Sequence, residues 1–139
     1  MLGRPTELQA RSMEDSKDEK SRIMTTMVIN KGNSERGTPG GVDTEDLVFL
    51  LSEEEAHMYF GDGSGGVLAK AQATPYAASR GVRVMGSEAN AYWWLRSPGH
   101  NERQAVYVDN GGKLQGYVGE GVSFATHGVR PAMWIELPT

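Results

Sequence analysis

The sequence of 139 residues contains no cysteine. Disulfides, thiolate nucleophiles and cysteine-ligated zinc or iron–sulfur sites are therefore excluded. Long apolar runs are also absent, and none approaches the roughly 18 residues that a membrane-spanning helix needs, so we expect no membrane insertion. The N-terminal segment, MLGRPTELQARSMEDSKDEK, lacks the apolar stretch of a secretory signal, and we expect no signal peptide in this chain.

Positive charge is scarce and scattered. The chain has 14 Lys and Arg residues against 18 Asp and Glu residues, which gives a formal net charge of -4. Proteins that bind phosphate backbones gather their basic residues into a patch or stripe. Because this sequence has no such cluster, nucleic acid is not an expected partner.

Glycine, by contrast, is abundant, with 18 residues placed between short apolar stretches. This pattern favours many turns and short strands. In the C-terminal half it predicts strands over 91–96, 105–108 and 113–118, a hairpin turn over 109–112 and a final strand over 128–137. Short helices followed by hairpin strands indicate an α+β fold with a mainly antiparallel sheet.

The clearest local signal lies in the segment LVFLLSEEEAHMYFG. The apolar run 47–51 predicts a buried strand that leads directly into a helix. Ser52 is the expected helix cap, Glu55 completes a capping box, and Gly61 ends the helix. On this helix we expect an inward face of Ala56, Tyr59 and Phe60 and an outward face of Glu53, Glu54 and His57.

Weaker signals complete the expected chain path. They predict a helix over 13–24 with Ser12 as its cap, a strand over 25–30, a loop over 32–41, and a second short helix over 75–80 with Thr74 as its cap.

The segment AYWWLRSPG, residues 91–99, places two indoles side by side. In a strand, Tyr92, Trp94 and Arg96 share one face, while Trp93 and Leu95 share the other. Both faces must then be covered, and an arginine fork suits ordering of nearby carbonyls or an acid. We therefore expect a structural framework, with ligand stacking as the alternative, made of Trp93, Trp94, Arg96, Arg130 and Trp134.

The glycine-rich run at 61–66 and the three acids at 53–55 resemble parts of catalytic sites, but neither matches a catalytic motif in full. The run GDGSGG at 61–66 matches the glycine spacing of a dinucleotide site, yet it follows a helix where that fingerprint follows a strand. Gly63 interrupts the local match to a serine-protease loop, so we expect Ser64 to lie in a mobile loop without a catalytic role. The acids 53–55 are explained by a helix N-terminus. We predict no catalytic residue and no enzymatic activity.

Metal-ligand spacing is also missing. No pair among His57, His100 and His127 lies one helical turn apart, so no transition-metal site is expected. No cofactor is expected either. Several loop residues carry side-chain oxygens that could bind calcium, but their spacing is not that of an EF-hand. We expect them to lie in solvated turns, with calcium binding as the alternative. These residues are Asp43, Glu45, Asp46, Asp62, Asp109 and Asn110.

Five segments in a fixed order carry a resemblance: DLVFLLSEEEAHMYF, TPYAASRG, WWLRSPG, AVYVDNGG and GVRPAMWIEL. Together they resemble a gut-bacterial domain family of unknown function marked by WWLRSPG and GVRPA motifs. That family looks related to the C-type-lectin-like fold in its formylglycine-generating-enzyme-type branch, which also includes the variable proteins of diversity-generating retroelements. The enzymes of that branch resemble copper-dependent oxidases that act through cysteines, so this cysteine-free chain cannot take over their activity.

The resemblance covers residues 19–137 and implies the domain organisation. We expect a single C-type-lectin-like domain over 19–139, with short helices packed on a twisted, mainly antiparallel sheet. Residues 1–18 match the family poorly and are expected to be a frayed N-terminal segment. The resemblance also favours a surface-displayed, exported or phage-associated setting as part of a larger protein.

A binding or display role follows as the functional expectation, with a protein or glycan as the ligand. Tyr107 and Asp109 share a strand face opposite Val106 and Val108, which fits a polar outer face beside a buried one. The chain has no Glu-Pro-Asn or Gln-Pro-Asp triplet, which favours protein over sugar. An enzyme of unrecognised type and a purely structural module are the alternatives. The candidate ligand-binding residues are His100, Asn101, Arg103, Gln104, Tyr107, Asp109, Asn110, Lys113, Gln115 and Tyr117, with Glu102 and His127 beside them.

Overall fold

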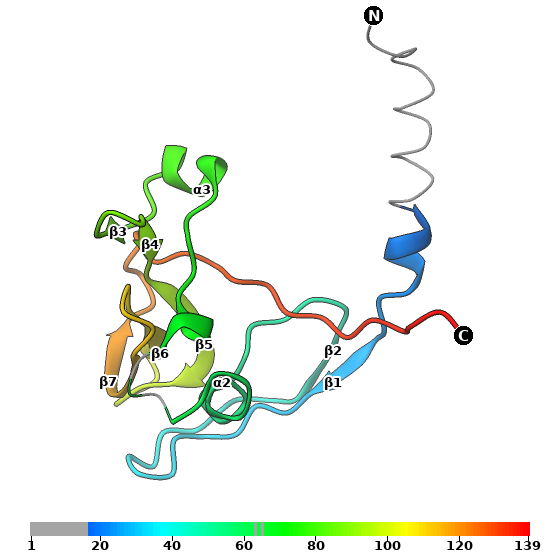
Figure 1. Cartoon of the computed structure of the whole chain (residues 1–139). Helices are drawn as coiled ribbons and strands as arrows, with labels where there is room; N and C mark the ends of the chain where they lie inside the picture. Colours follow the sequence, from blue (N-terminus) through cyan, green and yellow to red (C-terminus); the bar gives the residue numbers. More distant parts are fainter. Residues whose placement is uncertain (1–16, 63, 65) are drawn as a thin grey trace, which may run out of the picture.

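The structure is a computed structural model that describes residues 17–62, 64 and 66–139, and for 116–118 it describes the backbone alone (Figure 1). It is an α+β fold of short helices and small antiparallel sheets, as the sequence predicts. The elements in chain order are β1 Thr26–Val28, β2 Thr44–Asp46, α2 Glu53–Phe60, the 3-10 helix η1 Val67–Ala69, α3 Pro75–Ser79, β3 Val84–Met85, β4 Asn90–Ala91, β5 Trp93–Pro98, β6 Gln104–Val108 and β7 Leu114–Gly121.

Within the described residues, three sheets replace the single sheet that the sequence predicts: β1 pairs with β2, β3 with β4, and the three-stranded sheet has the order β5-β6-β7. The predicted hairpin between β6 and β7 is confirmed, with Tyr107 opposite Gln115. Its turn is fastened by the Asp109 carboxylate, whose Oδ1 accepts from the backbone N–H groups of Gly111 at 2.9 Å and Lys113 at 3.0 Å.

The strand β5 lies at the edge of its sheet by element order, yet its outer edge is also paired. The Trp94 N–H donates to the Gly128 carbonyl at 3.0 Å, and the Gly128 N–H donates to the Tyr92 carbonyl at 2.6 Å. Farther along, the Arg96 N–H donates to the Leu51 carbonyl at 2.9 Å. Because β5 has backbone partners on both edges, it can carry a large aromatic side chain on each face.

The capping of α2 is confirmed in full. The Ser52 hydroxyl accepts from the Glu55 N–H at 3.1 Å, and the Glu55 carboxylate accepts from the Ser52 N–H at 2.9 Å. Gly61 ends the helix with a φ of 105°, which favours glycine. The predicted inward face is right for Ala56, which is fully buried, but wrong for Tyr59, which is 43% exposed.

The helix α3 also begins as predicted, since the Thr74 hydroxyl accepts from the Ala77 N–H at 3.1 Å and Pro75 opens the helix. Ahead of β1, residues 17–21 are helical. The predicted helix over 13–24 is therefore confirmed only at 17–21, since residues 22–24 are not helical. Its first residues, 13–16, and its predicted cap, Ser12, lie outside the described residues.

Two predicted strands are wrong. Residues 47–51 do not form a strand, because among the described residues their one β-bridge joins Phe49 to Ala132. The final segment 128–137 is an extended strap that touches neighbours at single isolated bridges. An apolar run becomes a regular strand only where a partner runs alongside it, and these two segments meet each other at one position.

The core lies between the inner face of the β5–β7 sheet and the helices α2 and η1. Trp93, Leu95, Val106 and Val108 are each at most 1% exposed, and they come from β5 and β6 at alternating positions. The remaining buried members of this cluster are Leu51, Ala56, Ala69 and Leu114. The alternation of buried and half-buried side chains confirms that Val106 and Val108 face inward.

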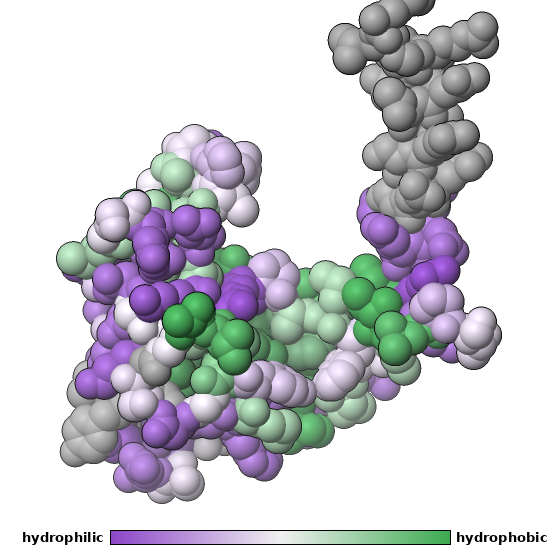
Figure 2. Space-filling view, viewed as in Figure 1, coloured by the Kyte–Doolittle hydropathy of each residue, from purple (hydrophilic) through white to green (hydrophobic). Residues whose placement is uncertain are grey.

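The strap crosses from the sheet to the segment just ahead of β1, where the Glu136 N–H donates to the Arg22 carbonyl at 2.9 Å (Figure 1). Figure 2 shows apolar surface gathered in a hollow between these two parts of the molecule. A groove of about 420 Å³ lies between α2 and the strap, lined by Phe49, Leu51, Glu55, Tyr59, Pro131, Ala132, Met133 and Trp134. Among the described residues, no helix has the length and apolar character to span a membrane.

Candidate functional site

Five rings gather on the outer face of the β5–β6 pair, and we call this group the aromatic face: Tyr92, Trp94, Tyr107, Phe124 and His127. The His127 ring stacks on Trp94 with a centroid distance of 4.5 Å and meets the edge of Tyr107 at 4.6 Å. Tyr92 and Phe124 each lie 5.5 Å from the same ring. The face is therefore built around one imidazole.

The fold explains why these rings meet. Tyr92 and Trp94 alternate with the buried Trp93, so both leave β5 on the outer side. Tyr107 is the Cα partner of Trp94 across the β5–β6 pair. The pairing of Gly128 with β5 then delivers His127 onto the same surface.

His127 is the least exposed polar member of the face, at 8% exposure. Neither of its ring nitrogens has a hydrogen-bond partner among the residues that the structure describes. Burial lowers the pKa of the imidazole below its ordinary 6.5, the nearby Glu120 carboxylate opposes this effect, and Arg83 adds to it. His127 is therefore held neutral at pH 7. His127 was named beside the candidate ligand residues, and the structure places it at the buried centre of the aromatic face.

The depressed pKa of His127 predicts how stability changes with pH. The unfolded chain takes up a proton on this imidazole near pH 6.5, while the folded chain resists it, so acidification favours unfolding. The free energy of unfolding should hold above that pH and fall as the pH drops below about 6.5, until the folded imidazole is protonated as well. The measurement is urea unfolding across this pH range. The free energy of unfolding should fall less with acid for His127→Phe than for wild type, because phenylalanine keeps a ring but cannot titrate. Equal slopes for wild type and His127→Phe would contradict the assignment.

The predicted ligand residues before β6 lie at the β5–β6 turn. His100, Asn101 and Arg103 are exposed there, together with Glu102. The Asn101 side chain accepts from the Arg103 N–H at 2.9 Å and so shapes the turn. Gln104 is half-buried, and its Oε1 is a buried atom without a described hydrogen-bond partner.

The predicted residues after β6 lie at its other end. Asp109 holds the β6–β7 turn, and its Oδ2 accepts from the Gln115 amide at 2.9 Å. Lys113 is exposed and Asn110 is half-buried. The side chain of Tyr117 lies outside the described residues. Because the five residues of β6 separate the two turns by roughly 16 Å, the predicted set does not converge on one point.

Tyr107 is the predicted ligand residue that joins the aromatic face. Its half-buried hydroxyl has a raised pKa, chiefly through burial and then through the charge of Glu120. The sequence reasoning missed Tyr92, Phe124 and Arg83 as members or neighbours of this surface. The Arg83 guanidinium lies over the Tyr92 ring, 4.6 Å from its centroid. The alternation in AYWWLR was the available signal for Tyr92, whereas Phe124 and Arg83 arrive through tertiary contacts alone.

The proposed framework residues differ in their surroundings. Trp93 is buried and its indole N–H donates to the Ala69 carbonyl at 3.0 Å. Trp94 is half-buried and belongs to the aromatic face. The indole of Trp134 is 53% exposed, and its backbone carbonyl accepts from the Met24 N–H at 2.8 Å. Trp134 therefore contributes to the fold through its backbone, in contrast to the buried Trp93 ring.

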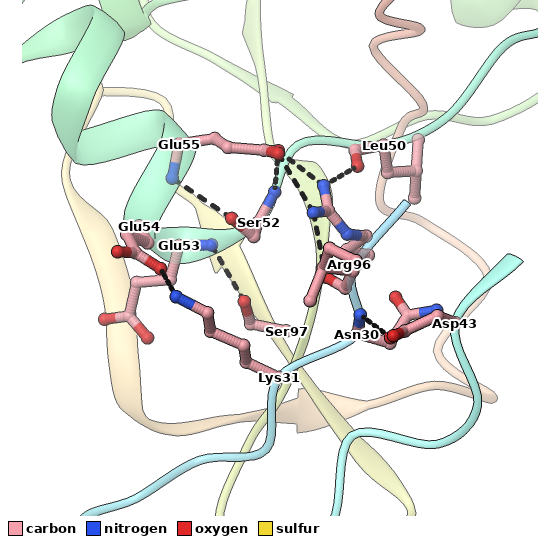
Figure 3. Close-up of polar contacts among 11 residues, drawn as sticks. Asn30, Lys31, Asp43, Leu50, Ser52, Glu53, Glu54, Glu55, Arg96 and Ser97 are labelled. Atoms are coloured by element: carbon pink, nitrogen blue, oxygen red, sulfur yellow. Dashed lines mark hydrogen bonds and ion pairs between the residues drawn. The ribbon is translucent and has the colours of Figure 1, made fainter. Parts of the chain in front are cut away.

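Arg96 joins three segments of the chain (Figure 3). Its guanidinium forms a two-pronged ion pair with the Glu55 carboxylate, with one contact at 3.0 Å. It also donates to the carbonyls of Leu50 at 2.8 Å and Ile29 at 3.1 Å. Although burial raises the pKa of Glu55, the contacts with Arg96 and Ser52 outweigh it and leave that pKa below its usual value.

A cavity of about 680 Å³ opens beside this ion pair, between the N-terminal turn of α2 and the loop after β1. Figure 3 shows Lys31 and Glu54 across it, paired at 2.9 Å, and the Ser97 hydroxyl accepting from the Glu53 N–H at 2.8 Å. The Arg96–Glu55 pair thus lies on the inner side of the cavity and the Lys31–Glu54 pair at its exposed rim.

The residues weighed for chemistry lie apart. The Ser64 hydroxyl donates to the Asp62 carboxylate at 2.5 Å, which lowers the pKa of Asp62, and this geometry is that of an exposed turn. Among the described residues, no three His, Asp or Glu side chains are grouped as metal ligands. Of the loop oxygens weighed for calcium, Asp43 accepts from the Asn30 N–H and Asp46 accepts from the Thr44 hydroxyl.

Comparison with known proteins gives one assignment. No curated protein and no solved structure matches the chain. A family model does match, and it spans residues 14–137, which include every element and every ring described above. The chain therefore belongs to the DUF6273 family, a domain of unknown function.

Proposed function

We propose that this domain is a non-catalytic binding module that recognises another protein through its aromatic face. One observation carries the proposal, namely the packing of Tyr92, Trp94, Tyr107 and Phe124 around His127 on the outer side of a hairpin sheet. Tyrosine and tryptophan offer large contact areas with few rotatable bonds, so they bind at a small entropic cost. Their mutual packing holds the rings in place before a partner arrives.

The charges around this surface favour a protein partner. Arg83 stacks on Tyr92 at one side, and Glu120 acts on both Tyr107 and His127 at another. Aromatic residues at the centre with charged residues at the rim are typical of protein interfaces. The half-exposed Phe124, at 43%, supplies an apolar contact at the edge of the cluster.

We propose further that the scaffold is C-type-lectin-like. Support comes from the ordered motifs WWLRSPG and GVRPA and from an architecture in which short helices precede antiparallel hairpins. On such a scaffold the hairpin exterior is available for recognition while the inner face builds the core. A place within a larger surface-displayed or phage-associated protein fits this role.

Binding to arrays of immobilised proteins and glycans tests the function. Each hit would be titrated in solution with wild type, Phe124→Ser and Arg83→Glu, and we expect affinity to fall about tenfold or more in both variants. Tyr76→Ser is the matched control, because Tyr76 is a 74% exposed aromatic on α3, outside the aromatic face. The proposal would be contradicted if Tyr76→Ser lost as much affinity as the other two variants, or if none of the three substitutions changed the affinity. Hits confined to glycans would reassign the face to sugars.

A further inference from the structure

Arg130 is partly buried and has no acidic partner among the residues that the structure describes. Its guanidinium carbon lies 4.8 Å from the Phe60 ring centroid and 5.0 Å from that of Trp93. One hydrogen bond is present, from Nη1 to the Leu68 carbonyl at 3.3 Å. Burial alone accounts for the lowered pKa of Arg130, which agrees with the absence of an ion pair to any described carboxylate.

The surroundings of Arg130 differ from those of Arg96. The Arg96 side chain meets a carboxylate in two prongs and two backbone carbonyls. Arg130 has apolar rings beneath it and one long hydrogen bond, so most of its five N–H donors have no described acceptor. A guanidinium fork matches the geometry of a carboxylate, and desolvation strengthens that interaction.

Arg130 also lines a hollow. A cavity of about 340 Å³ is lined by Arg130 and Trp93 and extends toward α3. Small and aliphatic side chains supply much of its wall, namely Ala71, Ala73, Ala77, Val82 and Ala91. Thr74 also lines the cavity. Its hydroxyl accepts from the Ala77 N–H, and the hydroxyl proton has no acceptor among the described residues.

We propose that this cavity binds a carboxylate carried by a small aliphatic group, with Arg130 as the anion-binding residue. The unpaired fork receives the carboxylate, the Thr74 hydroxyl can donate to it, and the alanine-rich wall accepts a methyl-sized or isopropyl-sized group. The C-terminus of a peptide that ends in alanine or valine has this chemistry. The site is independent of the aromatic face, since Trp93 and Trp94 leave β5 on opposite sides.

Nuclear magnetic resonance titration of the whole chain tests the site. The probe is N-acetylalanine, and the reporter is the indole N–H of Trp93, which donates to Ala69 beside the cavity. We expect a saturable shift that is absent with N-acetylalaninamide, which has the same size but no charge. Glucuronate tests whether the carboxylate could belong to a sugar acid. Because the cavity wall is aliphatic, we expect glucuronate to bind more weakly than N-acetylalanine. A similar shift with the amide, or no saturable shift at millimolar N-acetylalanine, would overturn the proposal.

Variants separate the cation from the cavity. Arg130→Gln should weaken N-acetylalanine about tenfold or more, because a hydrogen-bonded charge pair is lost. Ala77→Leu keeps Arg130 and fills the cavity, so it should weaken binding as well and provides the test if Arg130→Gln does not fold. Arg103→Gln is the control for net charge, since Arg103 is exposed at the β5–β6 turn, and it should bind as wild type does. Unchanged affinity in Ala77→Leu would place the ligand elsewhere.

Discussion

Replacing Trp93 with alanine is expected to lower the free energy of unfolding by about 3–5 kcal/mol, the usual cost of truncating a buried aromatic residue. Trp93 is 1% exposed, and Phe60 meets its ring edge-on at a centroid distance of 6.1 Å. The change also removes the hydrogen bond from the indole to the Ala69 carbonyl. Domains of this size are stable by about 5–15 kcal/mol, so one substitution would consume a large share of that margin.

Urea denaturation of Trp93→Ala, Trp93→Phe and Trp134→Ala measures this effect. Trp93→Phe retains a ring in the core and should lose less than Trp93→Ala, although it still leaves the Ala69 carbonyl without its donor. Trp134 is the matched control within the chain, because its indole is 53% exposed. If Trp134→Ala were as destabilising as Trp93→Ala, the core would have to be centred on the strap instead of β5.

Features governed by short stretches of sequence were predictable. The Ser52–Glu55 capping box, the Thr74 cap and the turn at Asp109 each join residues a few positions apart. The inward direction of Val106 and Val108 follows from the pleat of a strand in the same way. In each case the interaction partners are visible in the sequence itself.

The errors share a different cause, which is dependence on distant partners. The apolar run 47–51 predicts a strand, yet a regular strand also needs a neighbour, and here Ala132 meets Phe49 at one isolated bridge. Tyr59 was expected to face inward on the helical period, but the strap leaves a groove above it instead of covering it. Period and propensity describe an element, and neither specifies what packs against it.

The candidate site shows the same division. Alternation along β5 placed Tyr92 and Trp94 on one face, and a strand prediction placed Tyr107 on an outer surface. The sequence could not reveal that the residues of the β5–β6 and β6–β7 turns lie at opposite ends of β6. His127 completes the aromatic face because Gly128 pairs with β5, a contact between residues far apart in the chain.

The second large effect concerns Arg96. Its side chain is 14% exposed and that of Glu55 is 30% exposed, so their ion pair is largely shielded from water. Arg96→Met should lower the free energy of unfolding by about 3–5 kcal/mol, because it leaves the Glu55 carboxylate partly buried without a counter-charge. It also removes the N–H groups that donate to the carbonyls of Leu50, from Nη1, and Ile29, from Nη2. Arg96→Lys keeps the charge but loses the planar fork, so it should be intermediate.

Variants of Glu55 separate the ion pair from the helix cap, since the same carboxylate serves both. Glutamine can still accept from the Ser52 N–H, so Glu55→Gln removes the charge and keeps the cap, while Glu55→Ala removes both. Because the folded-state pKa of Glu55 lies below its ordinary 4.5, its contribution is present above that pH and is lost as the pH falls through the folded value. Stability of Glu55→Gln should therefore depend less on acid than that of wild type. A cost for Arg96→Met no greater than about 1 kcal/mol, as for an exposed pair, would refute the shielded ion pair and its role in joining β5 to α2 and β1.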